Sequence, residues 1–202
     1  SPDFIKLDRV ELIRKIVDSE YIYRSNKRLA TRLQLGHLKG CPQDLSNCVD
    51  TAERTYAPEG TIKHLSSLKF IENGMNVCIL GASNSGKTYL AKAIGLSACS
   101  HYRVEYFCTE DLMDTLMLLK KTDKKKFGSR KKHLCSIELL ILDEAHSARV
   151  SKDISGSSKK TQVYSMLESV SSKIPHIILA TATPMQKEDR KSTRLNPVTS
   201  LS

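Results

Sequence analysis

The segment GASNSGKT, residues 81–88, is the feature that most limits what this chain can fold into. It fits the phosphate-binding pattern G-x-x-x-x-G-K-[ST] at every fixed position, follows the apolar run NVCIL and opens the helical pattern KTYLAKAIGLSA. Glycines let the backbone wrap around phosphate oxygens, while the loop amides and the helix N-terminus direct positive charge at an anion. A strand, a phosphate-binding loop and a helix are therefore predicted in this order.

The side chains of this segment indicate which ligand it takes. Lys87 is placed to reach the β- and γ-phosphates of a nucleotide, and the Thr88 hydroxyl is placed to fill one coordination position of Mg²⁺. The predicted cofactors are therefore ATP and Mg²⁺. The alternative is a chance glycine-rich loop, which a strand and a helix in the right register make improbable. The residues predicted to contact the nucleotide are Gly81, Ala82, Ser83, Asn84, Ser85, Gly86, Lys87, Thr88 and Tyr89.

A second motif, ELLILDE, covers residues 138–144 and reads as a buried strand ending in two acids. Asp143 at the strand end is predicted to hold Mg²⁺ through water, across from Thr88, and Glu144 to polarise the attacking water. These roles predict an ATPase that converts ATP and water to ADP and phosphate. The alternative is an acidic strand end in an ordinary loop. The phosphate-binding motif upstream favours the catalytic interpretation.

The order of the remaining patterns predicts an α/β fold, a P-loop NTPase three-layer sandwich with a parallel sheet. We expect three parts: a helical N-terminal appendage and linker at residues 1–55, an ATPase core at 56–188 and a polar tail at 189–202. The appendage contains a helix at 8–35 with one apolar stripe. Strands are expected at 76–80, 103–108, 138–142 and 176–180, helices at 61–72, 87–99, 110–121 and 161–172, and a polar loop at 151–160.

Charge and cysteine usage bear on partners and location. The net charge is +10, and the segment KKTDKKKFGSRKK, Lys120 to Lys132, holds eight cations and one anion. Such a segment favours DNA or another polyanion, although a solvated loop that only keeps the protein soluble is the alternative. The six cysteines form no C-x-x-C pair, which favours buried thiols in a reducing cytoplasm. No run approaches the ~18 apolar residues of a membrane span.

Residues 8 to about 143 resemble the IstB-like transposition helpers, relatives of the DnaC helicase loaders within the AAA+ ATPases. The resemblance rests on LIRKIVDSEYIYRSNKRLATRL, FIENGMNVCILGASNSGKTYLAKAIGLSAC, YRVEYFCTEDLMDTL and LLILDE. It implies an ATP-dependent homo-oligomer that assembles on DNA and helps a transposase or a replicative helicase. In the family pattern Gly81 to Thr88 bind ATP, and Asp143 with Glu144 handle Mg²⁺ and water. Asn84 departs from the pattern, in which a glycine is usual, but leaves the phosphate-binding frame intact.

Residues 143–187 instead resemble superfamily-two helicases of the Swi/Snf type, on DEAHSARV and TQVYSMLESVSSKIPHIILATATPMQ. This resemblance implies that His146 and Thr181–Thr183 couple ATP hydrolysis to domain movement. Alternatively, Thr181 or Thr183 is the polar sensor that follows the second acidic motif in P-loop ATPases. The short interval between the two motifs argues against a whole helicase. DRKSTRLNPVTSLS, residues 189–202, resembles a translated sequencing adapter, so we hypothesise a join between two genes near Asp143.

The patterns also give expectations about how complete the sheet is and about what the protein does. The resemblance implies strand order 5-1-4-3-2, and only four strands are found, so the fifth is expected to be missing. The strand at 76–80 would then be an exposed edge, stability would be marginal and ATP would bind weakly and turn over slowly. The leading function is a DNA-associated ATPase that helps a transposase or loads a helicase. The alternatives are a superfamily-two motor fragment and a nucleotide-switched binding module without turnover.

Overall fold

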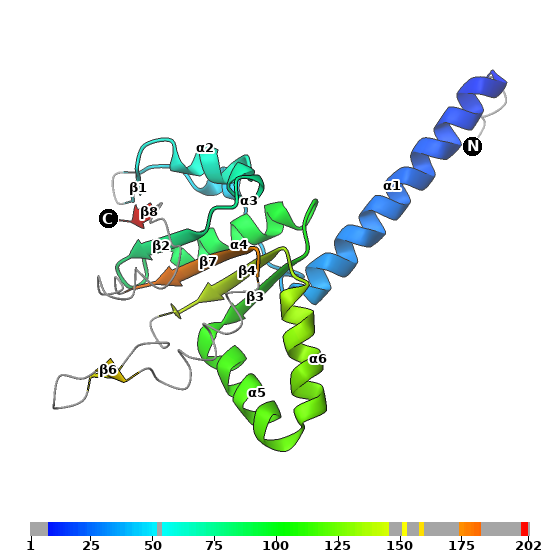
Figure 1. The fold of residues 1–202 in the computed structure, drawn as a ribbon. Helices are drawn as coiled ribbons and strands as arrows, with labels where there is room; N and C mark the ends of the chain where they lie inside the picture. The colour runs from blue at the N-terminus through cyan, green and yellow to red at the C-terminus, as the bar shows by residue number, and fades with distance from the viewer. Residues whose placement is uncertain are drawn as a thin grey trace.

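The fold is organised around one twisted sheet with helices on both faces (Figure 1). The computed structural model describes residues 8–51, 54–145, 151–152, 158–159, 174–182 and 199–201. The sheet order is β1-β8-β2-β7-β4-β3. All neighbours are parallel except β1 and β8, so the strands after β1 follow the expected order 5-1-4-3-2. The strands are β1 (Tyr56–Ala57), β2 (Val77–Gly81), β3 (Val104–Cys108), β4 (Leu139–Asp143), β7 (His176–Thr181) and β8 (Thr199–Leu201).

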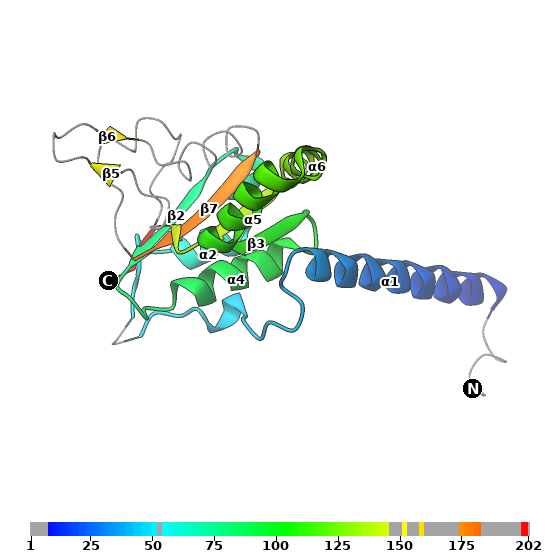
Figure 2. The ribbon, with the colours of Figure 1, turned by 90° about the horizontal axis from the view of Figure 1, so that it is seen from below.

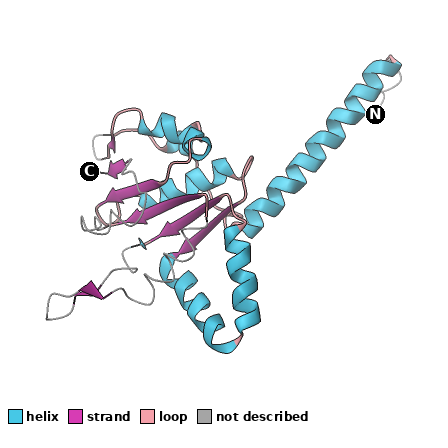
Figure 3. Ribbon diagram, viewed as in Figure 1, coloured by secondary structure: helices cyan, strands magenta, loops and turns pink. Residues whose placement is uncertain are grey.

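The helices form the two outer layers, as Figures 2 and 3 show. One face of the sheet is covered by α4 together with α2 and α3, and the other by the hairpin of α5 and α6. The predicted three-layer α/β fold is therefore confirmed. The helices are α1 (Arg9–Leu35), the 3₁₀ turn η2 (Leu45–Asn47), α2 (Thr61–Ser66), α3 (Lys69–Glu72), α4 (Lys87–Ala98), α5 (Thr109–Thr122) and α6 (Lys124–Cys135).

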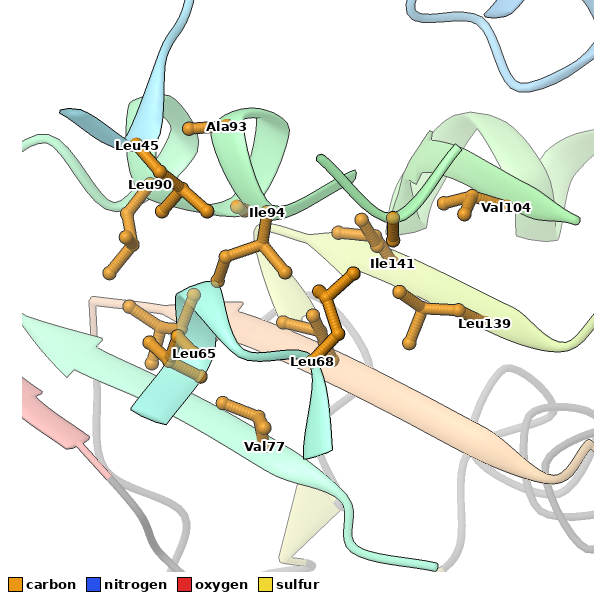
Figure 4. Packing of buried hydrophobic residues seen from close by; sticks show 14 of the residues in the cluster. Leu45, Leu65, Leu68, Val77, Leu90, Ala93, Ile94, Val104, Leu139 and Ile141 are labelled. Atoms are coloured by element: carbon orange, nitrogen blue, oxygen red, sulfur yellow. The ribbon is translucent and has the colours of Figure 1, made fainter. Parts of the chain in front are cut away.

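The hydrophobic core has two halves because successive strand residues point to opposite faces of the sheet. On β4, Leu139 and Ile141 join the half beneath α4, and Leu140 and Leu142 join the half beneath α5 and α6. All five residues of β4 are buried. Such a continuous apolar strand is what a sheet covered on both faces requires. Figure 4 shows part of the first half, where side chains of α4 such as Leu90 and Ile94 face the sheet.

The expectation of a missing fifth strand is wrong. β8 lies beside β2, pairing Ile79 with Thr199 and Gly81 with Leu201, and β1 covers the far side of β8. The tail is polar and contains Pro197, a composition that disfavours a strand. However, pairing uses backbone groups, and the proline lies before the three paired residues, where its missing N–H does no harm. The strand that carries the phosphate-binding loop is therefore an interior strand, and the reason to expect marginal stability falls away.

Most other predicted elements agree with the structure, with differences at the ends. The helix predicted at 61–72 is two short helices, because Leu68 adopts a left-handed backbone with φ 55° between them. The polar segment 151–160 contains two paired two-residue strands, β5 (Ser151–Lys152) and β6 (Ser158–Lys159). The helix predicted at 161–172 lies outside the described residues. Within the described ranges, every helix is too short or too polar to span a bilayer.

Helix α1 projects from the core and touches it only at its C-terminal end (Figure 1). None of its residues is buried, and its predicted apolar stripe of Val10, Ile13, Ile16, Val17 and Tyr21 is exposed. Near its end, Leu29 and Leu33 pack against the core, and the Arg32 guanidinium donates to the carbonyls that follow α4. The sequence thus predicts the helix and its stripe, while the structure shows that the stripe does not enter the core.

The close approach of α1 to β3 depends on Gly36. A Cβ added at Gly36 would stand 2.6 Å from the Val104 carbonyl oxygen and 3.0 Å from that of Arg32. Both are backbone atoms, so Gly36→Ala is expected to destabilise the fold by about 1–3 kcal/mol, measured by urea unfolding. Gly128→Ala in α6 is the control, because a Cβ there meets nothing within 4 Å and alanine favours a helix. Equal midpoints for the two variants would contradict this prediction.

Candidate nucleotide-binding site

The phosphate-binding loop connects β2 to α4 at the carboxyl edge of the parallel sheet. Asn84 and Gly86 both take left-handed backbone conformations, with φ 63° and 90°. Asparagine is one of the few residues with a Cβ that tolerates this region, so the departure at Asn84 fits the loop without glycine. The Lys87 Nζ donates to the Ala82 carbonyl at 2.5 Å, which folds the lysine back over the loop. The predicted strand, loop and helix are all present.

A pocket of about 230 Å³ opens beside this loop. It lies where polar strand ends meet helix N-termini, which is where α/β folds bind ligands. It brings the two sequence motifs together, since residues of the loop, of the end of β4 and of the end of β7 all face it. Its lining consists of Ser83, Asn84, Gly86, Lys87, Thr88, Asp143, Glu144, Ala180, Thr181 and Ala182.

Asp143 is the centre of the hydrogen-bond network in this pocket. The Thr88 hydroxyl donates to Asp143 Oδ2 at 2.6 Å, and the Glu144 backbone N–H donates to Oδ1 at 2.9 Å. The side chain of Asp143 is buried, and Thr109 Oγ1 donates to its carbonyl at 2.7 Å. A hydroxyl and a carboxylate side by side are the oxygen ligands that Mg²⁺ prefers, so the residues fit this ion.

Tyr106 also contacts Asp143, and the sequence did not single it out. Its hydroxyl donates to Asp143 Oδ2 at 2.8 Å, the same oxygen that Thr88 contacts. Burial, and then this hydrogen bond, raise the pKa of the phenol far above its ordinary value, so it remains a donor. Tyr106 reaches the site because β3 pairs with β4 in the register that sets Cys108 opposite Asp143. Only the register reveals this proximity, because 37 residues separate the two side chains in sequence.

Glu144 stands at the mouth of the pocket with an unusual backbone. Its φ of 52° lies in the left-handed region, which costs free energy for a residue with a Cβ. The turn lets its N–H bond to Asp143, while its carboxylate is exposed and lies 4.0 Å from the Cys108 thiol. A carboxylate in this position can contact a water molecule in the pocket. Strain at such a place is typical of functional sites.

The other predicted site residues divide into four groups. Gly81, Ala82 and Ser85 shape the loop without lining the pocket. Tyr89 turns away: its hydroxyl accepts hydrogen bonds from the Asp44 N–H at 3.2 Å and from the Asn47 amide at 3.4 Å. Thr181, one of the two sensor candidates, is buried at the end of β7 and lines the pocket. Thr183 and His146 lie outside the described residues. Ala180 and Ala182 are lining residues that the sequence did not indicate.

The basic segment Lys120–Lys132 is a helical hairpin, not the loop considered as an alternative. Asp123 divides it, since its side chain accepts hydrogen bonds from the N–H groups of Lys125 and Lys126 at 3.0 and 2.9 Å and so caps α6. Lys120 and Lys121 end α5, and Lys124–Lys126 form the first turn of α6. All five lysines at this hairpin tip are exposed.

One cation of the segment faces inward. Arg130 Nη2 lies 3.4 Å from an oxygen of Glu105, a buried carboxylate on β3 whose other oxygen contacts His133. The Arg130 guanidinium also lies over the ring of Phe107, 5.2 Å from its centre. Arg130 therefore holds α6 against the sheet, and the exposed charge of the segment is that of its lysines.

The model of the family described as "IstB-like ATP binding protein" matches residues 5–187. The chain belongs to the IstB-like ATP-binding protein family. Among curated relatives, an insertion sequence IS232 putative ATP-binding protein of Bacillus thuringiensis subsp. berliner is 29% identical over 69% of this chain and 54% of its own length. The putative insertion sequence ATP-binding protein y4uH of Sinorhizobium fredii is 31% identical over 68% and 54%. The chain spans about half the length of these relatives.

Solved structures support the fold of this IstB-like chain. The replication initiator DnaA bound to AMPPCP and single-stranded DNA matches with a TM-score of 0.57 and 21% identity, over 75% of this chain and 46% of that one. The DnaC helicase loader matches with a TM-score of 0.51 and 17% identity, over 73% and 81%. At these identities the likeness concerns the fold alone. The expected membership of the IstB-like family is confirmed by the family model, and the likeness to DnaC is one of fold.

The match also corrects the hypothesis of a hybrid chain. Because the IstB-like model continues past Asp143 to residue 187, residues 144–187 belong to the same family domain, and the resemblance to superfamily-two helicases is not borne out. An acidic strand end followed by a polar sensor residue is also expected of P-loop ATPases, so these residues do not require a helicase origin. The adapter resemblance of residues 189–202 finds no support either, and three of these residues form β8.

Proposed function

We propose that this chain binds ATP with Mg²⁺ and hydrolyses it, as the ATPase core of an insertion-sequence helper that works on DNA. The observation that carries the proposal is the contact between Thr88 and Asp143, at 2.6 Å, beside the phosphate-binding loop. Two motifs 55 residues apart in sequence converge there on one pocket. Such convergence is typical of a P-loop site for nucleotide and metal, whereas an accidental glycine loop would have no carboxylate partner.

In this proposal each side chain has one task. The loop amides and Lys87 bind the β- and γ-phosphates, and Lys87 exchanges the Ala82 carbonyl for phosphate oxygens. Thr88 and Asp143 would hold Mg²⁺, which would neutralise charge on the phosphates. Tyr106 and the Glu144 N–H keep the Asp143 carboxylate in place. Glu144 accepts a proton from the water whose oxygen bonds to the γ-phosphorus as the bond from that phosphorus to the oxygen of ADP breaks, and Thr181 is the proposed sensor of the γ-phosphate.

The test is ATP hydrolysis and ATP binding by the purified chain, with and without Mg²⁺ and with and without a DNA duplex. We expect Mg²⁺-dependent release of phosphate. Failure to bind ATP at millimolar concentration would overturn the proposal. Residues 56–188 are proposed as the catalytic core and residues 1–55 as an appendage that meets the partner. That partner is proposed to be a transposase or a replicative helicase, met in the cytoplasm by an ATP-dependent homo-oligomer.

The hairpin tip supports DNA as a partner. Lys124–Lys126 occupy the first turn of α6, where the helix dipole already presents positive charge, so these lysines raise the electrostatic free energy of the free protein. A phosphate backbone would relieve that repulsion. Six of the segment's seven lysines are exposed, Lys131 being half-buried, and only Lys126 has an acidic partner among the described residues, Asp123 at 3.6 Å. The phosphate backbone of a DNA duplex is a polyanion that these exposed lysines can bind.

Replacing Lys124, Lys125 and Lys126 together by glutamine is expected to weaken DNA binding and to flatten its salt dependence. Each phosphate contact contributes about 0.9 to the slope of log affinity against log salt, so the slope should fall by about 2 to 3. Fluorescence anisotropy with a labelled duplex from 50 to 200 mM salt measures both quantities. The matched control replaces exposed Lys39, Lys63 and Lys69, far from the hairpin, and removes the same charge. Equal losses in the two triple variants would contradict a specific role for the tip.

A further inference from the structure

Arg54 lies against the phosphate-binding loop although it belongs to neither motif. It lies in the connection between η2 and β1, and hydrogen bonds with Thr51 hold its backbone. The Thr51 N–H donates to the Arg54 carbonyl at 2.7 Å, and the Arg54 N–H donates to Thr51 Oγ1 at 3.1 Å. The backbone that carries the Arg54 side chain is therefore fixed. In sequence, Arg54 precedes the core strand β2 by more than twenty residues.

The contact is with Gly86, the residue that caps α4. A Cβ added at Gly86 would stand 3.2 Å from Arg54 Cζ and 3.4 Å from each terminal nitrogen. The end of the guanidinium thus packs on the glycine of the loop, and any larger residue at 86 would push it away. Lys87, the next residue, lines the nucleotide pocket. Arg54 therefore adds its positive charge to that of the loop amides, of Lys87 and of the N-terminus of α4.

The charge of Arg54 is not balanced by a described carboxylate. None of the ion pairs among the described residues includes it. The Tyr56 hydroxyl, with which Arg54 interacts, is a neutral group, because burial raises the pKa of that phenol. The neighbouring Cys48 thiol is kept neutral in the same way, since burial raises its pKa too. The guanidinium is half-buried against Gly86 at the N-terminus of α4, and no described ion pair includes it, although Asp50 accepts a hydrogen bond from the nearby Tyr56 N–H. An anion stabilises a guanidinium in such a place.

We propose that Arg54 is a nucleotide-binding residue that contacts the phosphate chain of ATP from outside the P-loop motif. The inference rests on the proposed function, because it assigns a further contact to the same nucleotide, through a side chain that packs on the pocket residue Gly86. Arg54 offers planar N–H donors that can bind two phosphate oxygens at once, which Lys87 with its single ammonium group cannot do in the same geometry. Through this contact, the position of the segment before β2 would depend on whether a nucleotide is bound.

Titration calorimetry of the full chain with ATP, ADP and adenosine tests the assignment. Arg54→Ala is expected to weaken ATP and ADP binding by about tenfold, the loss of one charged hydrogen-bond pair. Arg54→Lys should recover part of this loss. Adenosine, which has no phosphate, should bind all variants equally. Tyr56→Phe is the matched control, because it removes the hydroxyl partner of Arg54 and keeps the ring and the cation.

Each other outcome overturns the proposal in a recognisable way. Unchanged ATP affinity in Arg54→Ala would mean that the guanidinium only packs on Gly86. Tighter ATP binding would mean that it obstructs the loop. An equal loss for adenosine would assign the contact to the base or the ribose instead of the phosphates. If the unmodified chain itself binds no ATP, the proposed function fails first, and it fails separately from these results.

Discussion

Replacing Lys87 by alanine is expected to lower the affinity for ATP by about 10- to 100-fold, because hydrogen bonds to charged groups are worth about 1.5–3 kcal/mol. Lys87 folds over the loop and donates to the Ala82 carbonyl, so the cation is already held where the phosphates would lie. Calorimetric titration with ATP measures the loss. Fold stability should change little, because the lysine contributes no buried apolar surface to either core half.

The control for Lys87→Ala is Lys63→Ala, an exposed lysine on α2 that does not line the pocket. It removes the same charge from the whole molecule, so it separates a local effect from a general change in net charge. ATP affinity that is unchanged in Lys87→Ala, or equally reduced in both variants, would mean that the pocket beside the loop is not where the phosphates bind.

Replacing Glu144 by glutamine is expected to leave ATP binding nearly intact and to reduce hydrolysis by at least about 100-fold, the usual contribution of a positioned general base. Glutamine keeps the shape of the side chain, and the backbone N–H that bonds to Asp143 is unaffected. Phosphate release under saturating ATP measures turnover, and calorimetry measures binding. Glu72→Gln on α3 is the control, because Glu72 is an exposed acid away from the pocket.

The Glu144 variant also separates an ATPase from a nucleotide-switched binding module. If turnover resets a complex with DNA or a partner, Glu144→Gln should trap that complex in the presence of ATP. If occupancy alone controls binding, the variant and the unmodified chain should release their partner alike. Full hydrolysis in Glu144→Gln would show that another group accepts the proton.

The sequence predicts the centre of the site well because its two motifs are local. Residues 81–88 bring their own strand and helix, and an apolar run ending in Asp143 can only lie at the carboxyl edge of the same sheet. Tyr106, Arg54 and Ala182 escape such reasoning. Each reaches the site through strand pairing or through a connection, and no short pattern records which strand lies beside which.

The basic segment and the last strand were harder to predict for opposite reasons. A run of lysines reads as a loop because it lacks apolar periodicity, yet Asp123 caps a helix there and Phe127, Leu134 and the inward Arg130 attach it to the sheet. Thr199–Leu201 has little apolar surface to mark it as a strand. It pairs through backbone groups supplied by β2 on one side and β1 on the other.

Because most of α1 is exposed, its backbone and the backbone of the core are expected to differ in stability. From Arg9 to Arg28 the helix buries no side chain, so its backbone is held by a local helix–coil balance and not by the cooperative unfolding of the core. Its amide protons can exchange with solvent through fraying, while those of β4 require the sheet to open. The core therefore gains almost nothing from this part of α1. A change in its helicity would leave the sheet, the loop and the pocket where they are.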